Sequence, residues 1–237
     1  MTKFARLLAS MLVSLPALLI PHASQAEVTT NWWGSWAQVV AEGNLSFIHP
    51  DLSPFRLWLE GQSRWNDDWQ DWYQGVARVA LGYAISDRAT VWVGYSFVPT
   101  QIAGTDYFGQ QDVWPAFRYV WPTELGTFTF RTMLEANFIH GNDPRLFPRQ
   151  LIRFMRPLEF EPRLSLVLWD EVLARGNNSQ WGGEAGFGQN RAFAGGGWSF
   201  SPLVRVELGY MHQYIDSNDH HSQVMQNMVV GSMFINF

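Results

Sequence analysis

The stretch VVGSMFINF, residues 229–237, alternates in character and ends the chain on an aromatic ring. Successive side chains of a β-strand point to opposite faces, so the odd-numbered residues from Val229 to Phe237 share one side. That side is almost entirely apolar, whereas the other side mixes polar and apolar residues. An amphipathic strand that closes on an aromatic residue indicates the last strand of a membrane β-barrel, in which Phe237 serves as the C-terminal assembly signal.

An export signal is expected at the other end of the chain. Lys3 and Arg6 supply positive charge, residues 7–20 are mostly apolar, and residues 24–26 offer small side chains to a signal peptidase. A transmembrane helix needs about 20 apolar residues, more than this segment has. We therefore expect a cleaved signal peptide over 1–26 and a mature barrel domain over 27–237. An uncleaved N-terminal anchor is the alternative.

Composition favours a membrane β-barrel over a soluble domain. Charged residues make up 16% of the chain, against about 25% in ordinary globular domains, and aromatic residues another 16%. No later segment has the roughly 18 consecutive apolar residues of a membrane helix. The aromatic surface is therefore expected to face lipid and the two membrane interfaces. The chain has no cysteine, which excludes disulfides.

The charge balance argues against a nucleic-acid partner, which would need a basic face. Of the 16 Lys and Arg, Lys3 and Arg6 lie in the signal, so 14 Arg face 21 Asp and Glu, and the net charge is 14 − 21 = −7. Because guanidinium groups form planar bidentate pairs with carboxylates, the exclusive use of arginine favours paired, partly buried charges. Codon bias is the alternative explanation.

Segments with two-residue periodicity alternate with turn-rich gaps throughout the mature chain. Their lengths suit transmembrane strands of about 9 to 11 residues. Short and long gaps alternate strictly, as short periplasmic turns and longer outer loops would require. The candidate strands are 33–47, 55–65, 72–85, 89–98, 111–121, 126–138, 149–158, 163–173, 188–200, 203–215 and 223–237.

These segments number eleven, whereas bacterial single-chain barrels have even strand numbers. The sequence therefore predicts an all-β, antiparallel transmembrane barrel of about 12 strands, with residues 27–33 as a short extra strand. Ten strands remain the alternative. Pro115 removes a hydrogen-bond donor in mid-strand, so we expect a bulge there.

Charged residues gather on one face of the strands. In the segment 126–138, Phe130 and Leu134 share one side, and Arg131 and Glu135 share the other. A one-residue slip would move each arginine into lipid at about 2 to 4 kcal/mol, so the register is well determined. The expected lumen charge network consists of Arg56, Glu60, Arg64, Arg78, Arg118, Arg131, Glu135, Arg153, Glu171, Arg191, Arg205 and Glu207.

Eight of these twelve charges are arginines and four are glutamates. We expect them to cross and largely fill the lumen as a ladder of ion pairs. The alternative is a wall of solvated charges around a water-filled pore, which the excess of arginine would make favourable to anions.

Seven short motifs extend over nearly the whole mature chain. They are LEGQSR (59–64), GY (82–83) followed by VGY (93–95), RTMLE (131–135), RFMRPL (153–158), DE (170–171), QNR (189–191) and ELGY (207–210) with Gln213. Their order and spacing resemble a family of proteobacterial outer-membrane barrels known only as a domain of unknown function. The resemblance implies a fold and a location but no activity.

Two groups of residues are candidate sites of chemistry. His212 is expected to face outward beside Tyr210 near an outer rim, where barrel enzymes that cut lipids hold a Ser–His pair, but the nearest outward serine, Ser63, lies on a non-adjacent strand. A girdle at the membrane interface explains His212 better. Another outer loop carries a cluster that suggests a cation site but lacks the spacing of a known one: Asp216, Asp219, His220 and His221.

The sequence thus predicts a bacterial outer-membrane barrel with a structural or accessory role and no catalytic residue, cofactor or metal. The expected partners are outer-membrane lipid, lipopolysaccharide and the barrel-assembly machinery. A narrow anion-favouring channel and a rim-located lipid-modifying enzyme are the alternatives. A soluble lipocalin-like barrel would need an apolar inside and a polar outside, opposite to the predicted faces.

Overall fold

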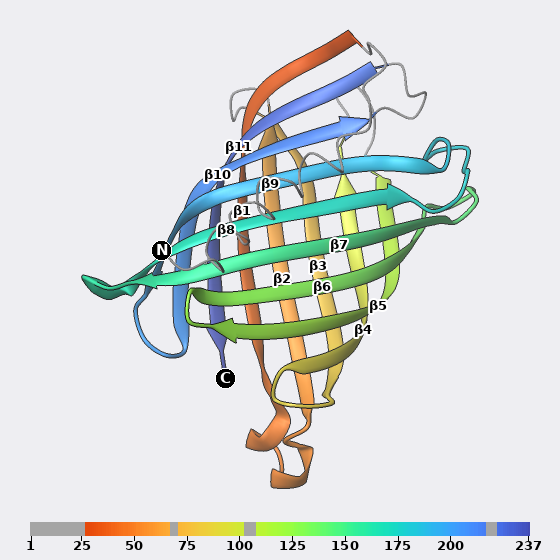
Figure 1. Ribbon diagram of the computed structural model, residues 1–237. Coiled ribbons are helices and arrows are strands. Elements are labelled where there is room, and N and C mark those ends of the chain that lie inside the picture. The colour runs from red at the N-terminus through yellow and green to blue at the C-terminus, as the bar shows by residue number, and fades with distance from the viewer. Residues whose placement is uncertain (1–26, 67–70, 102–107, 217–221) are drawn as a thin grey trace, which may run out of the picture.

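The computed structural model describes residues 27–66, 71–101, 108–216 and 222–237, and the predicted signal peptide lies outside these ranges. Eleven strands close into a barrel (Figure 1). They are β1 (Glu27–Asn44), β2 (Phe55–Asn66), β3 (Asp71–Ala84), β4 (Ala89–Thr100), β5 (Phe108–Thr123), β6 (Gly126–Phe138), β7 (Arg145–Leu158), β8 (Glu161–Arg175), β9 (Gly186–Ser199), β10 (Val204–Asp216) and β11 (Ser222–Asn236). Each overlaps with one of the eleven predicted segments, although most bounds differ by a few residues, and β-strand periodicity is the reason that the strands could be found.

The predicted strand number of 12, with ten as the alternative, was wrong. β1 and β11 pair in parallel, with Trp36 opposite Val230 and Val39 opposite Met233. The other neighbouring pairs in the described barrel are antiparallel. An even strand number is required only when the closing pair is antiparallel, and a parallel pair closes an odd number. Residues 27–33 extend β1 instead of forming a strand of their own.

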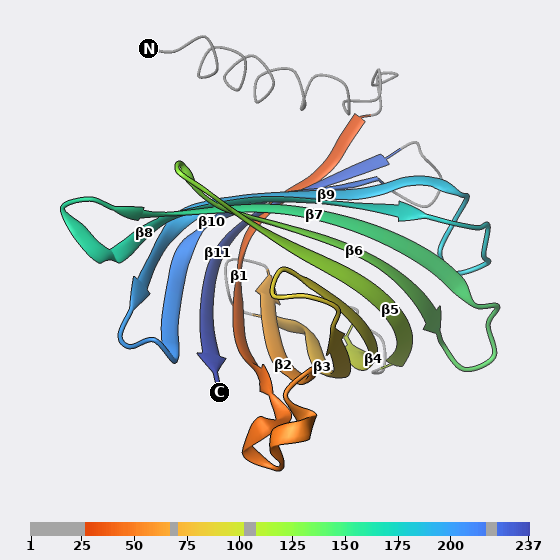
Figure 2. The same cartoon turned by 60° about the horizontal axis from the view of Figure 1, so that its bottom comes forward.

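The two ends of the barrel differ in their connections (Figure 2). Tight turns join β3 to β4, β5 to β6, β7 to β8 and β9 to β10 at the end where the chain finishes. The short 3₁₀ helices η1 (Leu45–Phe47) and η2 (Pro50–Leu52) join β1 to β2 at this same end. We call it the short-turn end, and we call the opposite end the long-loop end.

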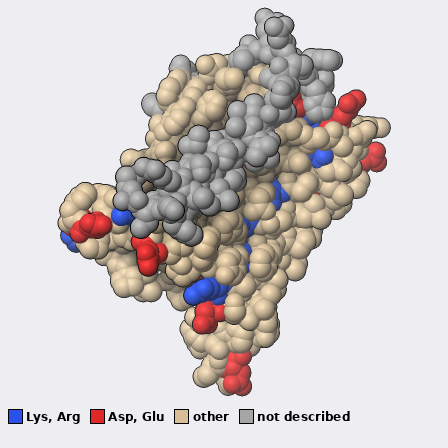
Figure 3. Space-filling view, in the orientation of Figure 1, with Lys and Arg blue, Asp and Glu red and all other residues tan. Residues whose placement is uncertain are grey.

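The predicted faces of the strands are confirmed. β4 alternates strictly: Trp92 is buried inside the barrel, whereas its neighbour Val93 is 65% exposed on the outside. Leu81 and Leu208 are also largely exposed. Figure 3 shows one face that is largely uncharged, with acidic side chains toward its margins and a few basic side chains in a row across it. The barrel is therefore apolar outside and charged inside, the reverse of a soluble lipocalin-like barrel.

Pro115 does not produce the predicted bulge. The register between β4 and β5 runs through Pro115 without a shift, and the register between β5 and β6 is the same on either side of it. Trp114 and Pro115 lie where the ladder to β6 is interrupted, between the pairs Val113–Ala136 and Ala116–Met133. The missing N–H of proline is therefore accommodated by a local gap in the ladder, with no extra residue in the strand.

Candidate functional site: the charged lumen

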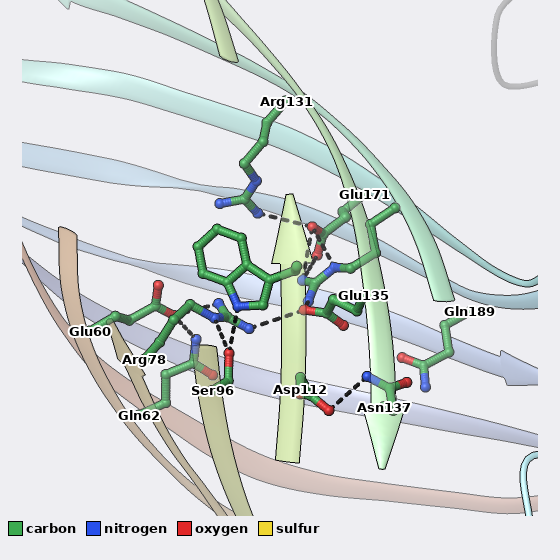
Figure 4. A network of polar contacts seen from close by, with 12 residues as sticks. Glu60, Gln62, Arg78, Ser96, Asp112, Arg131, Glu135, Asn137, Glu171 and Gln189 are labelled. Atoms are coloured by element: carbon green, nitrogen blue, oxygen red, sulfur yellow. Dashed lines mark hydrogen bonds and ion pairs between the residues drawn. The ribbon is translucent and has the colours of Figure 1, made fainter. Parts of the chain in front are cut away.

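A buried chain of ion pairs crosses the lumen (Figure 4). Arg78 on β3 reaches Glu60 on β2 with Nη1 at 3.2 Å and Glu135 on β6 with Nη2 at 3.3 Å. Arg149 on β7 continues the chain, because its Nη1 lies 2.6 Å from Glu135 and its Nη2 lies 2.8 Å from Glu171 on β8. These side chains are each 9% exposed or less.

Glu171 is the centre of this chain. Three arginines contact it: Arg149, Arg131 with Nη2 at 3.0 Å, and Arg191 with Nη1 at 3.4 Å. One carboxylate thus receives hydrogen bonds from β6, β7 and β9. Removing a charge from water costs several kcal/mol, and this cost is offset only where the remaining donors and acceptors are paired. We call Glu60, Arg78, Glu135, Arg149, Glu171 and Arg191 the central layer.

A second set of ion pairs lies nearer the short-turn end. Arg118 makes a two-pronged contact with Glu42. On other strands, Glu207 accepts hydrogen bonds from Arg153 and from Arg205 Nε at 2.8 Å. The arginines of this set are 15–23% exposed, more than those of the central layer. The lumen is therefore more open to solvent at the short-turn end than in its middle.

Tryptophan rings fill the space between the arginines. Trp36 lies under both Arg64 and Arg191, whose Cζ atoms are 3.9 Å and 5.3 Å from its ring centroid. Trp58 lies in the same way under Arg131 at 5.5 Å. A guanidinium group stacks favourably on an aromatic face, so these contacts stabilise the charges where water is scarce.

The expectation that the aromatic surplus faces lipid was therefore only partly right. Trp36, Trp58, Trp92 and Trp114 are buried inside the barrel. Two apolar clusters form there, one around Trp36 with Met211 and Met228, and one around the other three tryptophans. An eleven-stranded barrel has a lumen too wide for aliphatic residues alone to fill, and large aromatic rings supply the volume.

Most of the sequence-predicted lumen residues pair with an opposite charge in the structure. Arg56 and Arg64 differ: among the described residues no carboxylate pairs with Arg56, and Arg64 donates to the amide oxygens of Gln62 and Gln74 at 2.5 Å. The remaining ten charges of the predicted network each pair with an opposite charge: Glu60, Arg78, Arg118, Arg131, Glu135, Arg153, Glu171, Arg191, Arg205 and Glu207.

Two members of the network were missed in the sequence. Arg149 is the first residue of the predicted segment 149–158, whereas β7 begins four residues earlier, at Arg145, so that Arg149 lies well inside the strand. Glu42 lies on β1, whose alternation is weakened by glycine and alanine. The even spacing of Arg149 and Arg153 could have identified the first of them.

Below the central layer, toward the short-turn end, the lumen contains a cavity of about 370 Å³. Its lining includes Arg78, Arg131 and Arg149 from the central part, and Arg118 and Arg205 nearer the end of the barrel. Such a volume lies within the range of small-molecule sites. We call this space the lower cavity.

Among the described residues, the candidates for chemistry do not come together in a site. His212 lies on the outer face, and the hydroxyl of its neighbour Tyr210 donates to Asn227 at 2.5 Å. Ser63 is on β2 and accepts a hydrogen bond from Trp72 at 3.0 Å. Residues 217–221, with most of the Asp/His cluster, lie outside the described residues, and Asp216 pairs with Arg175. Elsewhere in the described chain, no group of three potential ligands for a metal is found.

The C-terminal residue takes part in closing the barrel. The backbone N–H of Phe237 donates to the carbonyl of Glu42 at 3.1 Å, and its own carbonyl accepts from the N–H of Asn44 at 3.2 Å. Its ring packs edge-on against Phe47 of η1 at 5.8 Å. Phe237 therefore extends the parallel β1–β11 pair by one residue beyond β11.

Comparison with known proteins identifies the family. The model of a family described as a protein of unknown function, DUF2490, matches residues 33–224. The chain belongs to the DUF2490 family. The matched range covers all of β2 to β10 and most of β1, so the family model describes the barrel itself.

A relative of this DUF2490 barrel is an uncharacterised protein of Methylorubrum extorquens, 28% identical over 152 residues. The match covers 59% of this chain and 63% of that protein, so the chain spans less than two thirds of the length of its relative. No solved structure matches the chain. Among the described residues, no helix has the length and apolar character needed to cross a membrane.

Proposed function

We propose that this DUF2490 barrel is an integral protein of the bacterial outer membrane, with a lumen closed by ion pairs and a structural or accessory role. The ion pairs of the central layer close the lumen. It links side chains from six strands, β2, β3, β6, β7, β8 and β9, and each of these side chains is 9% exposed or less. An ion cannot pass without separating pairs that have low exposure to water, which is costly.

The outer surface supports a lipid environment. Leu81, Val93 and Leu208 are each more than 60% exposed on the outer face of strands whose other face lines the lumen. Such side chains lose water contact only if lipid covers them, and the apolar band of an outer-membrane barrel is covered in this way. The partners that follow are membrane lipid, lipopolysaccharide at the long-loop end, and the assembly machinery, for which the exposed C-terminal Phe237 is the proposed signal.

Conductance in planar bilayers tests the closed lumen. We expect wild-type protein to give no steady current steps, and Arg149→Ala to give measurable ones, because Arg149 connects Glu135 to Glu171. Arg163→Ala is the matched control, since Arg163 is exposed beside Glu161 outside the lumen network. Steady steps from wild-type protein would contradict the closed lumen.

A narrow anion channel is the second candidate, and the excess of arginine favours it. Within the lumen, seven arginines share five glutamates: Arg78, Arg118, Arg131, Arg149, Arg153, Arg191 and Arg205 with Glu42, Glu60, Glu135, Glu171 and Glu207. Arg64 adds a further positive charge, which contacts only amide oxygens. If the lumen is such a channel, wild-type protein should give steady current steps. Their reversal potential in a chloride gradient should be that of an anion-selective pore.

A further inference from the structure

The lower cavity is closed above and open below. The central layer forms its upper boundary, with Arg78, Glu60 and Glu171 among the lining residues. Toward the short-turn end the lining includes Asn236 at the end of β11 and Arg205 at the start of β10. Side-chain exposure rises in the same direction, from 5% for Glu171 to 23% for Arg205. A ligand would therefore enter from the short-turn end and stop below the central layer.

The cavity lining has more guanidinium donors than its glutamates use. Among the described residues, Arg131 donates a single hydrogen bond, from Nη2 to Glu171. Arg205 likewise donates only one there, from Nε to Glu207. A guanidinium group has five N–H donors. Both glutamates keep other arginines, so neither Arg131 nor Arg205 is needed to pair a carboxylate.

The uncharged lining is mostly apolar and aromatic, with Gln38, Gln62, Thr129 and Asn236 as its polar members. Trp58, Trp169, Leu151, Val230 and Phe234 contribute to it. Trp36 also lines the cavity, and its buried Nε1 has no hydrogen-bond partner among the described residues. Small-molecule sites combine such walls with a few polar groups that fix orientation.

We propose that the lower cavity binds a small amphiphilic anion, with an apolar acyl or aromatic body and one carboxylate, sulfonate or phosphate group. The acidic group takes the unused donors of Arg131, and the body lies against the ring of Trp58 and the side chain of Leu151. Arg205 attracts the anion at the mouth. This site rests on the proposed function at one point, because the closed lumen supplies the upper boundary of the cavity.

Arg131 is the better anchor of the two arginines with unused donors. Its side chain is 17% exposed, less than that of Arg205, so an anion beside it is less screened by water. The ring of Trp58 beneath the guanidinium holds it in position. A charge-assisted hydrogen bond contributes more than a neutral one, so the loss of Arg131 should weaken binding by about tenfold or more.

Calorimetric titration of the full-length mature barrel in a nonionic detergent tests the site, with naphthalene-2-sulfonate as the probe and protein-free micelles as the blank. We expect saturable 1:1 binding to wild-type protein. Arg131→Gln should weaken it at least about tenfold, and Leu151→Trp should weaken it strongly by placing an indole where the apolar body lies, without a change of charge. Arg163→Gln, which removes an exposed arginine outside the cavity, should bind as wild type does.

Three results would overturn the proposal: no saturable binding to wild-type protein, unchanged affinity in both Arg131→Gln and Leu151→Trp, or equal affinity for naphthalene-2-methanol, which has no charge. Inorganic phosphate that bound as tightly as the probe would overturn the role of the apolar walls. The Arg131→Gln variant should fold, because Glu171 still pairs with Arg149 and Arg191. If it does not fold, the affinity of the Leu151→Trp variant tests the proposal. Conductance reports on the closed lumen separately, so either proposal can fail alone.

Discussion

At the scale of single residues, Glu171 and its three arginines determine how the centre of the lumen responds to substitution. Glu171→Ala leaves Arg131, Arg149 and Arg191 without their shared carboxylate in a poorly hydrated interior. Breaking a buried ion pair from one side costs about 3 to 5 kcal/mol. We expect a clear fall in the midpoint of thermal unfolding, measured from the gel mobility of samples that are heated but not boiled.

Two further variants separate charge pairing from a general effect of substitution. Arg131→Gln removes one cation but leaves Glu171 with two others, so its midpoint should fall much less. Glu161→Ala breaks a solvent-exposed pair with Arg163 and should leave the midpoint unchanged. Equal midpoints for Glu171→Ala and Glu161→Ala would contradict a packed, paired lumen.

For single residues, the sequence predicts the face on which a side chain lies but not the partner that it contacts. Arg131 and Glu135 could be assigned to the inner face, because a β-strand places alternate residues on one side. Their partners could not be assigned, because Arg131 meets a glutamate forty positions away along the chain. The aromatic surplus as a whole was expected to face lipid, whereas Trp58 and Trp114 lie inside the barrel, each with an arginine from another strand over its ring.

At the scale of elements, the strands were predictable and the closure was not. The segment 126–138 has the same bounds in the sequence prediction and in β6, because alternation and turn residues are local signals. The parallel pair of β1 and β11 joins the two ends of the chain, and nothing local distinguishes it from an antiparallel pair. The preference for an even strand number therefore led to the wrong count.

The parallel closure predicts a specific cross-link. Val39 and Met233 are paired residues on neighbouring strands, and both are exposed on the outer face. The chain has no cysteine, so Val39→Cys with Met233→Cys should form the only disulfide when oxidised by copper phenanthroline. Paired residues of neighbouring strands bring their Cα atoms within the range of about 4.4 to 6.8 Å that a disulfide needs. Non-reducing gels would detect the bond as a mobility shift.

A displaced pair is the control for that experiment. Val229 pairs with Ser35, four residues from Val39, so Val39→Cys with Val229→Cys should not cross-link. Four residues along a strand correspond to about 13 Å. Equal cross-linking of the two pairs, or none in the first, would contradict the parallel register.

At the scale of the whole molecule, the barrel has an apolar exterior and a cationic cavity that opens at one end, so its two ends are not equivalent. If the short-turn end faces the periplasm, the lower cavity samples periplasmic anions and the central layer separates it from the outside. From β3 to β11 shorter connections alternate with longer ones, which supports this orientation, because outer-membrane barrels keep their short turns in the periplasm. The connection between β1 and β2, residues 45–54, does not follow this alternation. The orientation therefore decides which compartment supplies a ligand.

Cysteine labelling in intact cells tests location and orientation together. Gln180 lies exposed in the connection between β8 and β9 at the long-loop end, and Asp87 lies exposed in the tight turn between β3 and β4. We expect a membrane-impermeant maleimide to label Gln180→Cys in intact cells. It should label Asp87→Cys only after the outer membrane is permeabilised, because that turn would lie on the periplasmic side. The opposite pattern would place the mouth of the lower cavity at the cell surface, and labelling of both in intact cells would contradict insertion across the membrane.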